Sequence, residues 1–182
     1  MSGHSKWSKV KHQKAASDAI KGKLFTKASQ AITVALSEGG GITDPAGNFK
    51  LRLAIEKARA VNMPKENIDR AIARAVIVAR SGGLETILYE GFGPGGTAIL
   101  IEAATDNRQR TVSAIRNVLE TAGGSLGSAG SVGYLFERGD GLVYRPIIRL
   151  ALSEADTTKL DALVTKLEEL DDVQRVFTNM EE

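Results

Sequence analysis

Lysine side chains are concentrated at the start of this 182-residue chain. Residues 1–27 contain seven lysines and one acidic residue, Asp18, with an aromatic and an imidazole side chain between the lysines. Lysines neutralise phosphates and release counterions, and an aromatic ring can stack on an unpaired base. The alternative is a solvated helix face with the tryptophan docked on the protein itself. The candidate nucleic-acid contacts of this segment are Lys6, Trp7, Lys9, Lys11, His12, Lys14, Lys21, Lys23 and Lys27.

Two arginines form a second candidate site. Arg108 and Arg110 follow Asp106 and Asn107, and either of these two residues can cap a helix that begins there. The free N–H groups and the dipole of a helix N-terminus favour negative charge, so the arginines predict an anion site for nucleic acid. A capped surface helix with solvated arginines explains the same residues equally well.

Two further patterns carry weaker signals. Arginines and lysines decorate predicted helices within residues 48–75, which permits a helix-turn-helix interpretation, although ordinary amphipathic helices also expose such side chains. The glycine-rich residues 93–96 lie between two predicted strands and lack the Lys-Ser/Thr of a phosphate-binding loop. They predict a hairpin turn that can approach another backbone closely, and they join the two arginines as a contact candidate.

The remaining composition excludes several classes of site. The chain has no cysteine, which excludes disulfides, thiol catalysis and cysteine-ligated metals. The only imidazoles belong to His4 and His12, and no third ligand has a matching spacing, so we expect no metal and no cofactor. No nucleophile elbow, triad order or cofactor fingerprint occurs. We therefore expect a protein that is not an enzyme.

Charge is distributed unevenly along the chain. Residues 1–80 hold 15 Lys and Arg against 6 Asp and Glu, whereas residues 81–182 hold 9 against 16. This asymmetry predicts a polyanionic partner for the first part. No apolar run approaches the roughly 18 residues of a membrane span, and the N-terminus lacks the apolar stretch of a secretory signal. We expect a cytoplasmic protein without membrane contact, with an organellar matrix as the lesser alternative.

The elements that must position these residues fall into two groups. Apolar residues at three- and four-residue spacing predict helices over residues 5–38, 48–61 and 64–75, with a break or kink at Gly22. Residues 1–80 therefore predict a basic helical bundle with an N-terminal arm. Residues 81–83 predict a linker to the second group.

Residues 81–182 predict an α+β sandwich of the ferredoxin-like type, with its helices on one side of the sheet. Helices are expected over residues 106–121 and from a cap at Ser153 onward. Strands are expected over residues 86–89, 97–102, 132–136, 142–144 and 173–177.

Short characteristic segments occur along nearly the whole chain. The opening GHSKW of residues 3–7, YEGFGPGG of residues 89–96 and DNR of residues 106–108 are examples. The other segments are residues 11–12, 14–16, 22–23, 25–27, 62–64, 70–72, 123–127, 130–132, 134–136 and 170–176. Together they resemble the YebC/PmpR family, which implies a helical N-terminal domain, α+β lobes behind it, and no catalytic residues.

The functions that the resemblance implies share a nucleic-acid partner. The first is a DNA-binding regulator of transcription in bacteria. The alternative is a ribosome-associated translation factor or translational activator that binds ribosomal or transfer RNA, as the mitochondrial translational activator of cytochrome oxidase exemplifies. Members of the family usually carry an extra lobe before the last helix, and here residues 144–148 run almost directly into that helix. We therefore expect a third lobe to be absent near residues 144–150.

Overall fold

The chain divides into two compact units, Met1–Gly83 and Leu84–Glu182. The computed structural model of the protein describes residues 3–139 and 143–181, with side chains described from residue 18 onward. Each unit has its own hydrophobic core, one built only from helices and the other from helices and strands.

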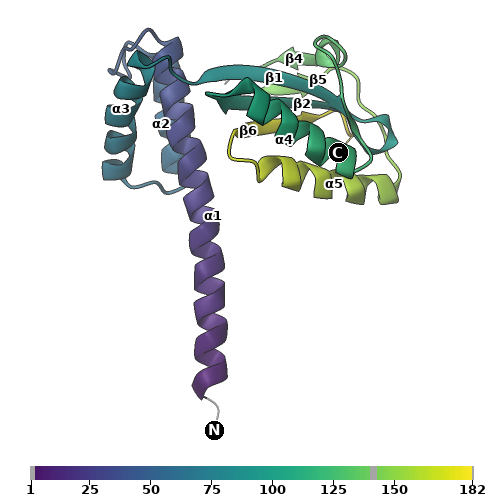
Figure 1. Ribbon diagram of the computed structural model, residues 1–182, viewed down its shortest axis with the longest axis horizontal. Helices are drawn as coiled ribbons and strands as arrows, with labels where there is room; N and C mark the ends of the chain where they lie inside the picture. The colour runs from purple at the N-terminus through teal and green to yellow at the C-terminus, as the bar shows by residue number, and fades with distance from the viewer. Residues whose placement is uncertain (1–2, 140–142, 182) are drawn as a thin grey trace. The chain divides into compact units, whose positions relative to one another are not determined.

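The first unit contains the helices α1 (Gly3–Glu38), α2 (Phe49–Ala60) and α3 (Lys65–Arg80) (Figure 1). Each helix contributes apolar side chains from one face, at the three- and four-residue spacing of an amphipathic helix. Its fully buried side chains include Ile32 and Leu36 of α1, Leu51 and Ala58 of α2, and Ala75 of α3. The bundle predicted from this spacing is present.

Helix α1 continues through Gly22, so the predicted break at this residue is wrong. A Cβ atom built on Gly22 would meet no heavy atom within 4 Å, which shows that no close neighbour requires a glycine there. Glycine in a helix interior costs only about 1 kcal/mol relative to alanine, and the turns on either side outweigh this cost. Helix α3 also exceeds its predicted end, because Val76 and Ala79 pack against the bundle core.

A buried asparagine fixes where α2 begins. Asn48 is 4% exposed, and its side-chain oxygen accepts a hydrogen bond from the N–H of Leu51. Its amide nitrogen donates to the carbonyl oxygens of Ala35 and Ile42, each at 3.1 Å. The same side chain therefore caps α2 and ties it to the end of α1.

The second unit is built on a four-stranded sheet with the order β3-β1-β2-β6. The strands are β1 (Glu85–Phe92), β2 (Ala98–Thr105), β3 (Ser125–Leu126) and β6 (Val173–Thr178), and every neighbouring pair is antiparallel. Strands β2 and β3 are parallel to each other with β1 between them, and α4 (Arg108–Thr121) connects them. This split β-α-β unit is the element from which ferredoxin-like sandwiches are built.

Alternating residues of β2 separate the two faces of the sheet. Ile99 and Ile101 belong to the core formed with α4 and α5 (Glu154–Glu168), which cover one face (Figure 1). Ala98 and Leu100 belong to a smaller core on the other face, next to the hairpin of β4 (Phe136–Arg138) and β5 (Tyr144–Pro146). The α+β class and the placement of both helices on one side are confirmed.

The predicted strand over residues 132–136 is wrong. Residues Gly133–Leu135 form the short 3-10 helix η2, and only the three residues of β4 follow as a strand. The N–H groups of Val132 and Gly133 donate to the carboxylate of Glu90, at 2.6 and 2.7 Å, instead of pairing with a strand. Of the predicted strand over residues 142–144, Leu142 lies outside the described residues.

Candidate nucleic-acid interface

The lysine-rich segment belongs to α1. The bounds of this helix include Lys6, Trp7, Lys9, Lys11, His12 and Lys14, whose side chains lie outside the described part. Packing against the bundle core begins at Phe25, and every residue from 18 to 24 is exposed. These residues make about two helical turns. No face of α1 is therefore covered along this stretch.

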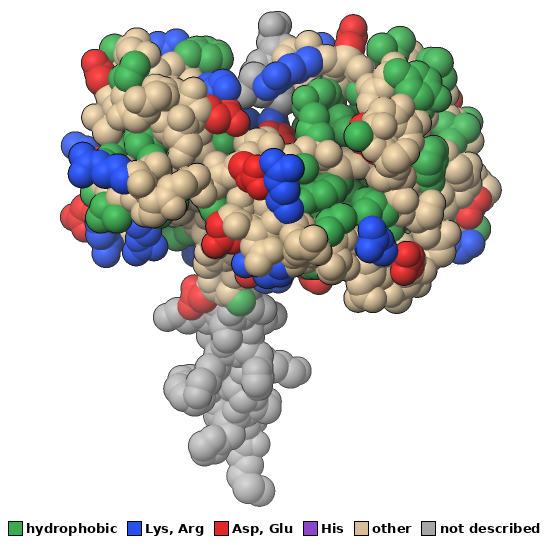
Figure 2. Space-filling view, turned by 45° about the horizontal axis from the view of Figure 1, so that its top comes forward, with side chains coloured by type: hydrophobic (Ala, Val, Ile, Leu, Met, Phe, Trp, Pro, Cys, Tyr) green, Lys and Arg blue, Asp and Glu red, His purple; other side chains and the backbone are tan. Residues whose placement is uncertain are grey.

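Two of the predicted lysines lie on the uncovered stretch. Lys21 and Lys23 are exposed, and neither has a hydrogen bond or ion pair within the described part of the chain. Lys27 is half-buried and takes part in an interaction within the protein. Lys21 and Lys23 therefore present free positive charge, whereas Lys27 is partly engaged. Figure 2 shows other Lys and Arg side chains grouped over the helices of this unit.

A hollow of about 480 Å³ lies between α1 and α3. Phe25 and Ser29 of α1 line one side, and Arg70 and Arg74 of α3 line the other. In the sequence, these two arginines resemble the other arginines on amphipathic helices. Their spacing of four residues could have indicated a shared site, because it places both arginines on one face of the helix.

In the second unit, Arg108 is bound by a carboxylate. Its Nε and Nη2 donate to the two carboxylate oxygens of Glu85 at the start of β1. Hydrogen bonding to Arg108 lowers the pKa of Glu85, and the same contact raises the pKa of Arg108. The guanidinium charge predicted to attract an anion is therefore balanced by a residue of the same unit.

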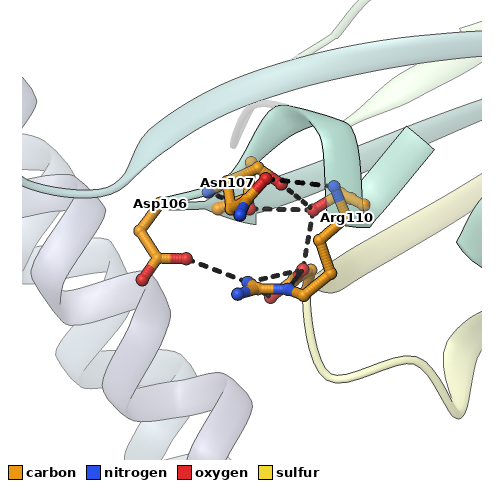
Figure 3. A network of polar contacts seen from close by, with 6 residues as sticks. Asp106, Asn107 and Arg110 are labelled. Carbon is orange, nitrogen blue, oxygen red and sulfur yellow. Dashed lines mark hydrogen bonds and ion pairs between the residues drawn. The ribbon is translucent and has the colours of Figure 1, made fainter. Parts of the chain in front are cut away.

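Arg110 is bound by two carboxylates (Figure 3). Its Nη2 lies 2.9 Å from an oxygen of Asp106 and 3.0 Å from an oxygen of Asp172. Hydrogen bonds to Asp172 and then Asp106 raise the pKa of the guanidinium. The backbone N–H of Arg110 donates to the side-chain oxygen of Asn107, which is the cap of α4. Of the two caps considered from the sequence, the structure selects Asn107.

A chain of hydroxyl groups completes this network. The N–H of Asn107 donates to the Thr105 hydroxyl at 2.9 Å, and that hydroxyl lies 2.8 Å from the Thr111 hydroxyl. The Thr111 hydroxyl in turn lies 2.7 Å from a carboxylate oxygen of Asp172. Because each hydroxyl has a single proton, Thr105 donates to Thr111 and Thr111 donates to Asp172. The DNR segment therefore anchors the start of α4 to the turn before β6.

The predicted anion site at Arg108 and Arg110 thus has three carboxylates beside it. A phosphate at the N-terminus of α4 would compete with Glu85, Asp106 and Asp172 for the two guanidinium groups. The geometry gives these arginines a clear role in joining parts of the second unit. Their role as nucleic-acid contacts stays a prediction.

The glycine-rich turn after β1 is packed against its neighbours. A Cβ on Gly93 would lie 2.8 Å from the Ile99 side chain, and a Cβ on Gly95 would lie 2.6 Å from that of Leu152. Gly95 also has a φ of 67°, in the left-handed region that favours glycine. Pro94 is buried. The predicted hairpin turn is present, and close packing inside the unit accounts for these glycines.

Glu90, in the same segment, organises a neighbouring loop. Its carboxylate accepts hydrogen bonds from the N–H groups of Gly130, Val132 and Gly133, at 2.6 to 2.7 Å. Burial alone raises the pKa of this carboxyl, but the three backbone donors outweigh burial and the pKa lies below its ordinary value. The contacts of Glu90 are therefore structural.

The described residues also bear on metals and membranes. Among them, no group of three or more His, Asp or Glu side chains could hold a metal ion. Within the same residues, no helix combines the length and the apolar character required to cross a membrane. The side chains of His4 and His12 lie outside the described part.

Comparison with known proteins places both units in one family. The model of the TACO1/YebC protein N-terminal domain matches residues 5–77, and that of the TACO1/YebC second and third domain matches residues 84–146. A probable transcriptional regulatory protein of Chlorobaculum tepidum, CT1665, aligns with 98% of this chain at 52% sequence identity. The chain belongs to the TACO1/YebC family. The resemblance seen in the sequence is thereby confirmed.

Two other known proteins are similar to this member of the TACO1/YebC family. A probable transcriptional regulatory protein of Shewanella oneidensis is 53% identical over 80% of this chain. The crystal structure of the conserved hypothetical protein Aq1575 from Aquifex aeolicus aligns with a TM-score of 0.77 and 32% identity, over 90% of this chain and 91% of that one. The chain spans 69% of the length of the Chlorobaculum relative and 58% of the Shewanella relative.

Proposed function

We propose that this protein is a nucleic-acid-binding regulator of gene expression, and specifically a DNA-binding regulator of transcription acting in the cytoplasm. The observation that carries the proposal is the uncovered, lysine-bearing stretch of α1 in a unit with a large excess of positive charge. The names of the relatives in Chlorobaculum and Shewanella, probable transcriptional regulatory proteins, agree with it. We assign no catalytic residue.

The dimensions of α1 suit a duplex. A helix of 36 residues is about 54 Å long at 1.5 Å per residue. Duplex DNA carries one negative charge for roughly every 1.7 Å of its axis, so a helix of this length passes many phosphates. An α-helix with its side chains, about 10–12 Å across, also fits the major groove, about 12 Å wide. Entry into a groove requires a helix that its own protein leaves uncovered, as α1 is at residues 18–24.

Lysines supply the affinity in this proposal, and their contribution depends on salt. Each phosphate that a lysine neutralises releases condensed counterions, so the binding constant falls steeply as the salt concentration rises. Lys21 and Lys23 are the contacts that the described side chains support best, because both are exposed and neither meets a carboxylate there. Lys6, Lys9, Lys11 and Lys14 extend the same helix toward its start.

The test is a binding titration of the full chain against duplex DNA, single-stranded RNA and intact ribosomes, each at low and at moderate salt. The proposal expects duplex DNA to bind most tightly at moderate salt, with a preference among sequences in a footprinting assay. Tighter binding to ribosomes than to any duplex would replace it with the translation-factor function. Binding to none of the three at either salt would contradict it.

A further inference from the structure

We propose that the hollow between α1 and α3 binds a single unpaired nucleotide, with the phosphate held by Arg74 and Arg70 and the base placed against Phe25. This inference rests on the proposed function and adds a defined pocket to it. The hollow lies wholly within the first unit. The α3 wall offers hydrogen-bond donors and the α1 wall offers acceptors, so a ligand must carry both an anionic group and donor groups.

The α3 wall supplies positive charge without carboxylate partners. Arg70 and Arg74 are one helical turn apart and line the same hollow, so their like charges repel unless an anion lies between or beside them. Arg70 donates to the side-chain oxygen of Asn67 and to the backbone carbonyl of Glu66, which are both uncharged acceptors. Arg74 has no hydrogen bond or ion pair among the described residues. Donors therefore remain on both guanidinium groups for a phosphate.

The α1 wall supplies acceptors. The Thr26 hydroxyl donates to the carbonyl of Gly22 at 3.1 Å, and the Ser29 hydroxyl donates to that of Phe25 at 2.9 Å. A hydroxyl that gives its only proton to a backbone carbonyl keeps its lone pairs as acceptors. Thr26 and Ser29 can therefore accept hydrogen bonds from a ligand but have no proton to donate to it. Sugar hydroxyls and the exocyclic amines of bases are donors of this kind.

The size and the apolar residues of the hollow favour one nucleotide. Phe25 and Met63 both line it, and Phe25 offers the aromatic surface on which bases stack in single-strand recognition. A volume of about 480 Å³ falls within the roughly 300–1,000 Å³ of small-molecule sites. A base pair within a duplex cannot enter such a hollow, whereas an unpaired nucleotide of RNA or of opened DNA can.

The hollow continues into the basic stretch of α1. Lys23, Thr26 and Gln30 follow one another at three- and four-residue spacing, so they share one face of the helix. Thr26 and Gln30 line the hollow, and Lys23 lies on the adjacent uncovered turn. A strand whose nucleotide occupies the hollow can therefore place its next phosphate near Lys23.

An acidic peptide is the competing occupant, since it also combines N–H donors with negative charge. The nucleotide is favoured because an aromatic ring lines the same hollow as the two arginines and because the hollow adjoins Lys23. Three segments that identify the family in the sequence, residues 25–27, 62–64 and 70–72, also meet at this hollow.

The decisive comparison uses Arg74→Gln and Arg59→Gln in the full chain. Arg59 is an exposed arginine of α2 that does not line the hollow, so both variants lose the same charge. The probes are fluorescently labelled single-stranded hexanucleotides of RNA and of DNA, read by fluorescence anisotropy. We expect R74Q to weaken binding about tenfold, and R59Q to weaken it less than about threefold. The hexanucleotide that binds more tightly shows whether the nucleotide in the hollow belongs to RNA or to DNA.

A second variant tests the base. Phe25→Leu should weaken binding of the hexanucleotide about tenfold, and it should leave binding of an abasic sugar-phosphate hexamer unchanged, because only the base stacks. A thermal melt establishes that this half-buried substitution leaves the unit folded. Equal effects on both probes in the folded variant would overturn the placement of the base.

The outcomes separate this inference from the proposed function. If the unchanged protein binds neither single strands nor duplex DNA, both proposals fail. If single strands bind equally to R74Q and R59Q, the pocket is wrong while the proposed function stands. If R74Q loses affinity for a decaglutamate peptide but keeps its affinity for both hexanucleotides, the hollow is a peptide site and the inference is overturned.

Discussion

Pairs of arginines close in sequence occur in both units, but among the described residues only the pair in the second unit is bound by carboxylates. Arg108 and Arg110 of the second unit are each held by carboxylates. Arg70 and Arg74 of the first unit line an open hollow, and no carboxylate is recorded beside either among the described residues. The spacing of cations along a chain therefore does not show which of them are available to a polyanion. Their partners decide, and those partners are distant in sequence.

The same contrast extends to other polar groups. In the second unit, the carboxylate of Glu90 accepts hydrogen bonds from backbone N–H groups, and the Thr111 hydroxyl is hydrogen-bonded to Asp172. In the first unit, Lys21 and Lys23 have no recorded partner in the described residues. Substitution of these two lysines of the first unit should therefore change binding with little change in stability, and substitution of Glu90 or Thr111 in the second unit should do the reverse.

The largest expected effect is on binding by the double variant Lys21→Glu, Lys23→Glu. Two attractive charges become repulsive, so we expect affinity for duplex DNA at low salt to fall about 100-fold, with a salt slope shallower by about 2. The melting temperature should stay unchanged, because both side chains are exposed. Lys166→Glu, at an exposed position of α5 in the second unit, is the control and should change affinity little. Equal losses in both variants would remove the contrast between the units.

Glu90→Gln should lower the free energy of unfolding by about 1–3 kcal/mol, because it removes the charge that three backbone N–H groups share. Chemical denaturation at pH 7 measures this difference. Nucleic-acid affinity should not change.

The same variant has a defined pH dependence. The folded-state pKa of Glu90 lies below its ordinary value of 4.5, so its contribution to stability is complete above that value and is lost as the pH falls through the folded pKa. The gap between the unchanged protein and the glutamine variant should therefore close on acidification. If the difference in stability between the two proteins increased below pH 4.5, the stabilising contact of the Glu90 carboxylate with the backbone N–H groups would be contradicted.

Thr111→Val should cost about 1–2 kcal/mol of stability. The residue is 2% exposed, and its loss removes the hydrogen bond between the Thr105 and Thr111 hydroxyls and one of the hydrogen bonds to the carboxylate of Asp172. Thr121→Val on the same helix is the matched control, since Thr121 is exposed and its hydroxyl, among the described residues, bonds only to the carbonyl of Asn117. Urea denaturation that gives the same cost for both variants would show that the network at the start of α4 contributes nothing.

The smallest expected effect is a gain. Gly22→Ala should stabilise α1 by up to about 1 kcal/mol, because the added methyl group meets no atom within 4 Å and alanine is the better helix former. Gly40→Ala, at a φ of 68°, should have the opposite sign. Circular dichroism and thermal melts check both. A loss of helicity in Gly22→Ala would indicate that α1 needs a flexible point there.

Local signals predicted the elements well. Apolar spacing located the helices of the first unit, and the caps Asn107 and Ser153 marked where α4 and α5 begin. The prediction failed where a distant group intervened. Residues 132–136 read as a strand because nothing nearby indicates that Glu90, 42 residues before Val132, takes their N–H groups.

The candidate site followed the same rule. The basic character of α1 could be read from composition, but the pairing of Arg108 with Glu85 spans 23 residues and that of Arg110 with Asp172 spans 62. The hollow could not be predicted, because it joins Phe25 of α1 to Arg74 of α3 only after the bundle has formed. Sequence reveals where charge is placed, and tertiary contacts determine where it stays free.

The most direct test of the central claim, that the first unit carries the nucleic-acid contact, is photo-crosslinking of the full chain to labelled DNA, with mass spectrometry of the crosslinked peptides. We expect crosslinks within residues 3–38 and 65–80, and we expect them to be lost in the Lys21→Glu, Lys23→Glu variant. Crosslinks confined to residues 84–181, unaffected by that variant, would contradict it.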